Sequence, residues 1–324
     1  MVQTFYQQQA ANRRESILLV GAVGVILGAL GFAIGYGTGG TPESAGLVTG
    51  IAVGFSGLLS LGSYFAGDSL VLAASRARPV TQASHPQLMN VVQELSIAAN
   101  TPPPRVYVID DSAPNAFATG RGPKHASIAV TSGLLEKLDR EELQGVIGHE
   151  LSHVRNFDIR FALLVAVLVG SIALLSDMFL RGFWRVGVGG RGDRRGGGGA
   201  LVIVMLVVAV VLAIVAPIFA RLVQLAVSRQ REYLADASSV ELTRNPAGLE
   251  RALAKIASDR EVLEVANRAT QHLYFVNPIK KFEARASGLM STHPPILDRI
   301  NRLRTLHGAS PLGAADVPAL AGLD

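Results

Sequence analysis

The chain has 324 residues, of which 49% are hydrophobic and 17% charged, and its mean hydropathy is +0.34. This composition excludes a disordered chain and an ordinary water-soluble protein, and it is typical of a membrane protein. The absence of cysteine excludes disulfides, thiolate zinc sites, iron–sulfur clusters and a cysteine nucleophile, and the net charge of +5 is explained by arginines that lie beside apolar runs.

Four apolar runs are long enough to cross a hydrocarbon core, which takes about 20 residues. The first run could be a cleaved signal peptide, but it is longer than the usual apolar stretch of about 7–15 residues and a second run follows at once. We therefore interpret it as an uncleaved anchor. The four predicted spans are residues 16–36, 45–65, 161–180 and 200–227.

Glycines recur at four-residue spacing in the first two runs, as at Gly24 and Gly28 and again at Gly31 and Gly35. Such spacing lets helix backbones approach closely. The alternative is that glycine is simply common in these runs.

The polar residues predict a soluble α+β domain that a membrane hairpin splits into two halves. We divide the chain into a two-span anchor, a first half, a second hairpin and a second half, with the boundaries 1–75, 76–160, 161–227 and 228–324. The predicted fold is therefore a mainly α membrane protein with four transmembrane helices and a domain that contains a small β-sheet.

Within the first half, hydrophobic periodicity predicts a helix over residues 85–99 and short strands over 105–109 and 126–131. A further helix begins at Asp139, which forms a capping-box pattern with Glu142. The second half is mostly helical and ends in an amphipathic stretch over residues 295–307.

His149, Glu150 and His153 form the pattern His-Glu-x-x-His in the helix that begins at Asp139. At 3.6 residues per turn, both imidazoles lie on one face, where they can bind one divalent ion, typically zinc. Glu150 lies about 100° around the helix, so it can act as a base toward a water on the ion without being a ligand. The alternative, a surface helix with a chance pattern, is disfavoured by the capped helical context.

Two histidines leave a catalytic zinc site incomplete, because it usually has three protein ligands. Asp158 lies too near His153 in the sequence to wrap back easily, and we expect it to be structural. Glu232 and Asp236 share a face of another predicted helix, which makes Glu232 the candidate third ligand and Asp236 the acceptor that fixes the tautomer of a ligand histidine. The alternative for this pair is a solvated charged face.

The predicted ligands lie on the same side of the membrane. His153 precedes the third run by eight residues and Glu232 follows the fourth by about five. Because two spans form one hairpin, both ligands lie within about two or three helical turns of the bilayer. Such a site favours substrates that are membrane proteins.

In these features the chain resembles the HtpX-type integral-membrane zinc metalloproteases, which are related to the CAAX prenyl proteases. The resemblance extends over most of the chain, and its motifs occur in the family's order. They are Asn115-Ala-Phe-Ala118, His149-Glu150-x-x-His153, Glu232-x-x-x-Asp236, Phe275-Val-Asn-Pro278 and Ser291-Thr-His-Pro-Pro295. The basic, glycine-rich stretch 181–199 departs from the short polar loop that the family often has.

The resemblance implies a zincin-like domain with Glu150 as catalytic base and one zinc ion per subunit, bound by His149, His153 and Glu232. It also implies that Asn115 lines the substrate cleft and contacts the peptide backbone, and that His293 helps to stabilise the oxyanion. By themselves, Asn115 would be a turn residue and His293 a histidine beside a Pro-Pro helix start.

The predicted function is membrane-embedded zinc endopeptidase activity in membrane-protein quality control, on membrane-protein or unfolded-protein substrates. We expect no nucleic acid or nucleotide partner, because the fingerprint-like string at residues 187–192 lies between two spans and no phosphate-binding loop occurs. One alternative is a CAAX prenyl-type protease, whose relatives have more spans. Another is a non-enzymatic scaffold or transporter, which the scarcity of ionisable residues in the spans disfavours.

The arginines around the first hairpin predict the orientation. Arg13 and Arg14 precede the first span and Arg76 and Arg78 follow the second, whereas the loop 37–44 has no Lys or Arg. The positive-inside rule then places the catalytic domain in the cytoplasm, at the inner membrane of a prokaryote. The arginines of the second hairpin would lie outside, against the same rule, unless that hairpin is re-entrant.

Overall fold

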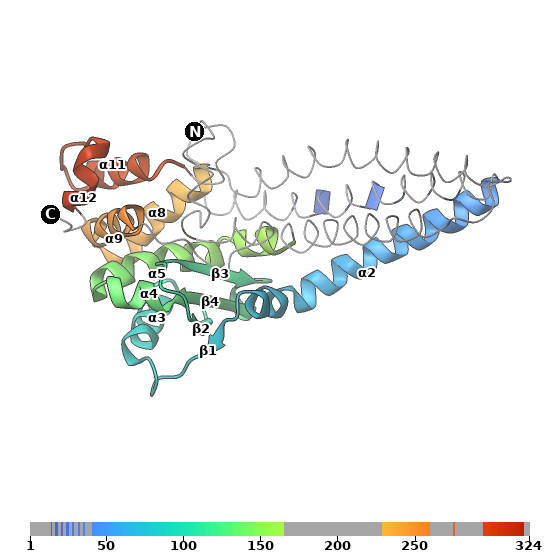
Figure 1. Ribbon diagram of the computed structural model, residues 1–324, viewed down its shortest axis with the longest axis horizontal. Helices are drawn as coiled ribbons and strands as arrows, with labels where there is room; N and C mark the ends of the chain where they lie inside the picture. Colours follow the sequence, from blue (N-terminus) through green and yellow to red (C-terminus); the bar gives the residue numbers. More distant parts are fainter. Residues whose placement is uncertain are drawn as a thin grey trace, which may run out of the picture.

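One long helix leads from the apolar part of the chain into a mixed α/β domain (Figure 1). The computed structural model describes residues 41–164, 229–259, 275 and 294–320, together with single positions between residues 14 and 35.

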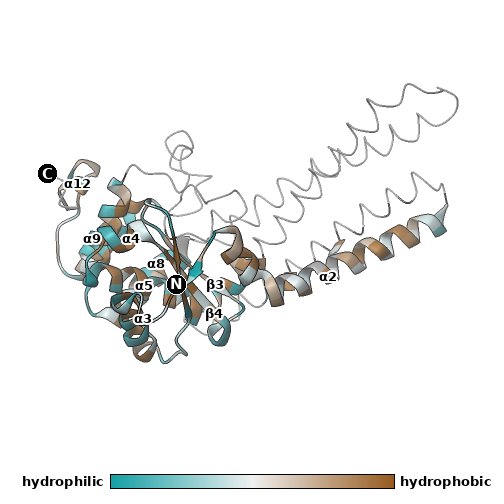
Figure 2. Ribbon diagram, turned by 60° about the horizontal axis from the view of Figure 1, so that its bottom comes forward, coloured by the Kyte–Doolittle hydropathy of each residue, from teal (hydrophilic) through white to brown (hydrophobic). Residues whose placement is uncertain are grey.

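Helix α2 (Pro42–Ala74) has 33 residues and begins at Thr41, whose side chain accepts a hydrogen bond from the Ser44 backbone. Its first 21 residues, Pro42–Gly62, are apolar enough to cross a membrane. At 1.5 Å per residue they extend over about 32 Å, the thickness of a hydrocarbon core. Hydrophobic residues follow one another along this helix as it leaves the domain (Figure 2). The predicted span 45–65 corresponds to it, although the helix continues well beyond.

The other predicted spans, 16–36, 161–180 and 200–227, lie wholly or largely outside the described residues. Single positions of the first span are helical, and so are residues 161–164 at the start of the third.

The first predicted span packs closely on α2 at two glycines. A Cβ atom on Gly35 would lie 2.6 Å from the carbonyl oxygen of Ser44, and one on Gly28 would lie 3.2 Å from the side chain of Val53. The Ser44 hydroxyl donates a hydrogen bond of 2.9 Å to the Gly35 carbonyl. The glycines of α2 itself do not make such close contacts. A Cβ atom on Gly46, for example, would have no neighbouring atom within 4 Å.

The sheet has four strands in the order β1-β2-β4-β3. Strands β2 and β4 pair in parallel, and the other pairs are antiparallel. The bounds of β2 and β4 match the predicted strands, whereas β3 has no alternating pattern in the sequence because all five of its residues are buried. The strands are β1 (Arg78–Pro79), β2 (Arg105–Ile109), β3 (Ala116–Gly120) and β4 (Ala126–Thr131).

Helices cover both faces of this sheet. Ile128 and Val130 of β4 belong to the main core, to which several helices of the domain contribute. On the other face, Phe117 of β3 packs with Val71 and Leu72 from the last turns of α2. Helix α2, which contains the candidate membrane span, is thus continuous with the domain and packs on its sheet.

Helix α5 lies at the centre of the helical layer, in contact with α3, α8 and α9 and with strand β3. The predicted helices over 85–99, from Asp139 and over 295–307 correspond to α3, α5 and α11. The helices of the domain are α3 (Pro86–Ala98), α4 (Ser132–Lys137), α5 (Arg140–Arg155), α8 (Arg229–Thr243), α9 (Pro246–Ser258), α11 (Ile296–Leu306) and α12 (Val317–Leu320).

Candidate metal centre

Helix α5 is fixed at its N-terminus by the predicted capping box. The Asp139 side chain accepts from the Glu142 backbone N–H at 2.9 Å, and the Glu142 carboxylate accepts from the Asp139 N–H at 2.8 Å. The predicted apolar stripe is buried throughout, which orients the remaining faces of the helix. The stripe comprises Leu143, Val146, Ile147, Leu151 and Val154.

Two glycines let neighbouring helices approach α5 closely. A Cβ atom on Gly145 would lie 2.7 Å from the Leu249 Cα of α9, and one on Gly148 would lie 2.8 Å from the Ser239 hydroxyl of α8. That hydroxyl donates a hydrogen bond of 2.6 Å to the Gly145 carbonyl. This contact holds α8 against α5 and so places Glu232 opposite the two histidines.

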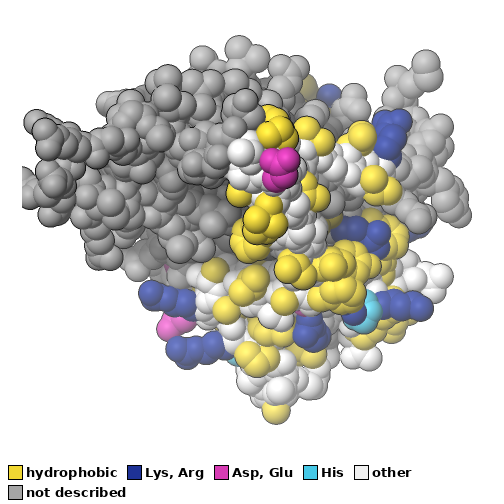
Figure 3. All heavy atoms as spheres, turned by 90° about the vertical axis from the view of Figure 1, so that its right-hand side faces the viewer, with side chains coloured by type: hydrophobic (Ala, Val, Ile, Leu, Met, Phe, Trp, Pro, Cys, Tyr) yellow, Lys and Arg dark blue, Asp and Glu magenta, His cyan; other side chains and the backbone are white. Residues whose placement is uncertain are grey.

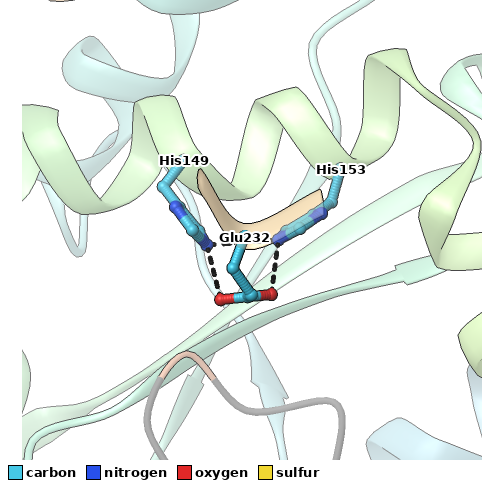
Figure 4. A group of neighbouring side chains, drawn as sticks. All are labelled: His149, His153 and Glu232. Carbon is cyan, nitrogen blue, oxygen red and sulfur yellow. Dashed lines mark hydrogen bonds and ion pairs between the residues drawn. The ribbon is translucent and has the colours of Figure 1, made fainter. Parts of the chain in front are cut away.

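The side chains of His149, His153 and Glu232 converge on one point (Figure 4). The two Nε2 atoms are 3.1 Å apart. The Glu232 carboxylate oxygens lie 3.5 Å from Nε2 of His153 and 3.7 Å from Nε2 of His149. The three groups offer ligand atoms within 4.8 Å of one another, so they could hold a metal ion. Two imidazoles and a carboxylate are the ligand types that zinc accepts.

Asp236 fixes the ring of His149. The His149 Nδ1–H donates to Asp236 at 2.9 Å, which leaves the lone pair of Nε2 directed toward Glu232. Burial lowers the pKa of His149 to about 4, so the ring is neutral, as a metal ligand must be. Glu232 and Asp236 are both buried, and the alternative of a solvated charged face is therefore wrong.

Asp158 orients the ring of His153 as Asp236 orients that of His149, a role that the sequence did not predict. The His153 Nδ1–H donates to the Asp158 carboxylate at 2.9 Å. Phe157, with φ of 62°, turns the chain back after α5, so that a residue only five positions away reaches the ring. Burial alone would lower the pKa of His153, but hydrogen bonds to Asp158 and Glu232 outweigh it and hold that pKa well above its ordinary value. A cation between the ring and Glu232 would act against this protonation.

Arg299 completes the support of the site and was also missed. It is fully buried, and its guanidinium donates to both oxygens of Asp236, at 2.6 and 2.9 Å. The group lies 4.7 Å above the ring of Phe275, which contacts His149 edge-on at 4.8 Å. A signal exists in the sequence, because Arg299 occupies the apolar face of α11 beside Ile300 and Leu303.

The net charge of the groups around the site is compatible with binding of a divalent cation. Two arginines are paired here, Arg299 with Asp236 and Arg231 with Asp158 at 3.9 Å. Glu150 and Glu232 add two more negative charges when ionised, so with neutral histidines the group has a net charge of −2. A divalent ion would neutralise it, which fits the buried donor set.

Glu150 lies beside this cluster and is buried. Burial raises the pKa of Glu150 to about 7. Nearby His153 and a hydrogen bond from the Ala118 backbone both lower this pKa, but burial outweighs them. Since Ala118 belongs to β3, the carboxylate is held between helix α5 and the edge strand of the sheet. A carboxylate with a pKa near neutrality is suited to accept and return a proton.

Asn115 directly precedes β3, and His293 lies outside the described residues. The Asn115 backbone exchanges hydrogen bonds with Thr131, and its side-chain oxygen accepts from the Ala116 N–H at 3.0 Å. The carbonyl of Ala116 accepts from the Phe275 N–H at 2.8 Å. The structure thus brings Asn115 to the strand that supports Glu150.

The chain is similar in sequence to known peptidases. The profile of peptidase family M48 matches residues 82–307. A protein named Protease HtpX homolog from Streptococcus uberis is 43% identical over 300 residues, covering 92% of this chain and 99% of the relative. One from Dictyoglomus thermophilum is 42% identical over 304 residues, covering 94% and 95%. Among solved structures, S. mikatae Ste24p aligns with 92% of this chain and 67% of its own at a TM-score of 0.46 and 17% identity.

Proposed function

This chain belongs to peptidase family M48 and is a metalloprotease, and from that premise we propose that it is a zinc-dependent endopeptidase embedded in the inner membrane of a prokaryote. The observation that carries the proposal is the convergence of His149, His153 and Glu232, each buried or partly buried, on one point beside Glu150. Membership of a peptidase family also makes the alternative of a non-enzymatic scaffold or transporter wrong.

One zinc ion per subunit would be held by His149, His153 and Glu232, with Asp236 and Asp158 orienting the two rings. The donor set of two imidazoles and one carboxylate is typical of catalytic zinc, which keeps a further position open. When bound, the ion supplies Lewis acidity, which lowers the pKa of water and polarises a peptide carbonyl.

Glu150 performs the proton transfers in this proposal. Its carboxylate takes a proton from the water that attacks the scissile carbonyl carbon, and it gives that proton to the leaving amine as the C–N bond breaks. The Ala118 N–H holds the carboxylate in place. His293 would donate a hydrogen bond to the oxygen that becomes negative during the attack.

The substrate would bind as an extended strand along β3. This strand is an edge of the sheet and leads directly to Glu150 through Ala118. Backbone hydrogen bonds to an edge strand bind peptides with little dependence on their side chains. Asn115, at the start of β3, would contact the peptide backbone. Such a site suits unfolded segments and membrane proteins, the substrate class that we propose.

The catalytic domain would face the cytoplasm, with the two halves of the domain joined through a second membrane hairpin. Arg76 and Arg78 follow the domain end of α2, whereas Glu43 lies at its far end. The positive-inside rule favours this orientation. The relatives named Protease HtpX homolog favour this proposal over the prenyl-type alternative.

The experiment that tests the proposal is cleavage of a model membrane protein by purified, detergent-solubilised enzyme. We expect activity with zinc, loss of activity with a chelator and recovery when zinc is restored. Cleavage that a chelator leaves unchanged, while metal analysis shows the protein to be metal-free, would overturn it.

A further inference from the structure

A pocket lies beside helix α2, just beyond the stretch that is apolar enough to cross a membrane. This pocket, of about 410 Å³, opens between α2, the start of β2 and the loop that joins β3 to β4. Its volume lies within the usual range for small-ligand pockets. The residues that line the pocket include Phe65, Asp68, Arg105, Arg121, Lys124 and His125.

A bilayer edge near Gly62 would place the pocket at about the depth of lipid headgroups. The candidate span of α2 ends at Gly62, although the helix stays apolar over Tyr64–Ala74, and Phe65 and Asp68 lie about 5 and 9 Å beyond Gly62 along it. The polar zone on each side of a bilayer is about 5–8 Å thick. Tyr64 is of a residue type that is enriched at the boundary between membrane and water.

The lining is strongly basic. Arg105, Arg121 and Lys124 contribute three positive charges, and the Arg121 guanidinium donates to Nε2 of His125 at 3.3 Å. Asp68 is the acidic residue that lines the pocket, and it pairs with Arg105 at 2.6 Å. The net charge of these four ionised groups is therefore +2, which favours an anionic ligand.

Two of the basic groups, Arg105 through Asp68 and Arg121 through aromatic rings, are held in place before any ligand binds. The Arg121 guanidinium lies 5.2 Å from the ring centroid of Phe65 and 5.7 Å from that of Tyr64. The Arg121 carbonyl accepts from Arg160 Nε at 2.9 Å. The loop turns at Gly120, whose φ of 129° favours glycine. A preorganised pocket loses less entropy on binding than a flexible basic loop would.

Apolar surface leads up to the pocket from the membrane. Leu58, Leu61 and Phe65 are exposed on α2 directly below it, where acyl chains would lie. Figure 3, which looks onto the end of the molecule from which α2 projects, shows Lys, Arg and His side chains among exposed hydrophobic ones. A phosphate group with acyl chains attached matches both surfaces, whereas a free phosphate would use only the basic one.

From these observations we propose that the pocket binds the phosphate headgroup of an anionic phospholipid, with its acyl chains on the exposed face of α2. The lipid would tie the loop between β3 and β4 to the bilayer surface. Basic pockets at membrane helices recognise anionic headgroups in this manner.

The test measures enrichment of phosphatidylglycerol around the full-length protein in nanodiscs of phosphatidylcholine that contain some phosphatidylglycerol. We expect the wild type to prefer phosphatidylglycerol. In the R121Q/K124Q variant, the enrichment of phosphatidylglycerol should fall about fivefold for each of the two charges removed. The single variant K124Q changes one exposed side chain and should show about half of the effect on a logarithmic scale.

Two further variants separate binding from damage to the fold. D68N removes the acidic charge of the pocket and should raise the preference by about fivefold, the opposite sign. R140Q makes the same charge change at the start of α5, far from the pocket. Helix α5 is about 24 Å long, and the pocket loop lies near its other end, where Arg160 contacts Arg121. This variant should therefore leave the preference unchanged.

Equal preference in the wild type and in R121Q/K124Q would overturn the proposal, and so would an equal loss in R140Q. Inorganic phosphate added to pure phosphatidylcholine nanodiscs tests the free anion. Binding of phosphate that depends on Arg121, together with no preference for phosphatidylglycerol, would also overturn it.

Discussion

Arg299 and Asp236 form a two-point ion pair inside the protein, with Nη2 and Nε of the guanidinium 2.6 and 2.9 Å from the two carboxylate oxygens. Burial alone would raise the pKa of Asp236, but Arg299 holds this pKa below its usual value, so Asp236 stays ionised. Because Asp236 also accepts from His149, an arginine 150 residues away helps to orient a candidate ligand histidine.

Replacing Arg299 with Met should destabilise the protein by about 3–5 kcal/mol, because Asp236 would remain buried and charged without its partner. Thermal or denaturant unfolding of the detergent-solubilised protein measures this. The control R140Q breaks an exposed pair with Glu94 and should cost less than about 1 kcal/mol. Equal stability of R299M and wild type would contradict the structural role given to this pair.

Replacing Glu150 with Gln should leave zinc bound and lower kcat by at least about 100-fold, since an amide cannot accept the proton of the attacking water. Metal analysis and a cleavage assay on the same sample measure both quantities. E141Q makes the identical change on an exposed position of the same helix and should keep wild-type activity. Cleavage by E150Q at the wild-type rate would show that another group is the base.

Replacing Asp158 with Asn should weaken zinc binding by about 10–100-fold, because the partner that orients the His153 ring loses its charge. Competition with a chromogenic chelator gives the affinity. D110N, at an exposed position on the same domain, is the matched control. If D158N bound zinc as tightly as D110N, then Asp158 would have only the structural role that the sequence suggests.

Replacing Gly145 with Ala should destabilise the domain by about 1–3 kcal/mol, because the added methyl group would lie 2.7 Å from the Leu249 Cα and push α9 away from α5. G57A, where nothing lies within 4 Å, is the control on α2. The shift in the unfolding midpoint between the two variants measures the difference. Similar midpoints would mean that the two helices can separate without cost.

The parts of the fold that could be predicted from the sequence are those with local signals. Helix α5 has a capping box, an apolar stripe and two histidines four residues apart, and all three lie within its 16 residues and the Asp139 that caps them. Strands β2 and β4 have β-branched apolar residues and were predicted with their bounds. Strand β3, in contrast, reads Ala-Phe-Ala-Thr-Gly and has neither alternation nor a β-branched run, because both of its faces are covered.

The groups that support the candidate site depend on contacts that no local pattern encodes. Asp158 reaches His153 only because Phe157 adopts a positive φ, a conformation that a bulky residue rarely has. Arg299 meets Asp236 across 63 residues of chain. The motif spacing therefore predicted the three candidate ligands, whereas the residues that orient them became evident from the packing of α5, α8 and α11.

X-ray absorption of the zinc-loaded protein tests whether two imidazoles of one helix and the carboxylate of Glu232 hold one zinc ion. We predict one zinc per chain with two imidazole nitrogens at about 2.0–2.1 Å and oxygen ligands at about 2.0–2.2 Å. In E232A the ion should be lost or should show an altered oxygen shell with both imidazoles retained. A spectrum with no imidazole or only one, or one that E232A leaves unchanged, would contradict the account.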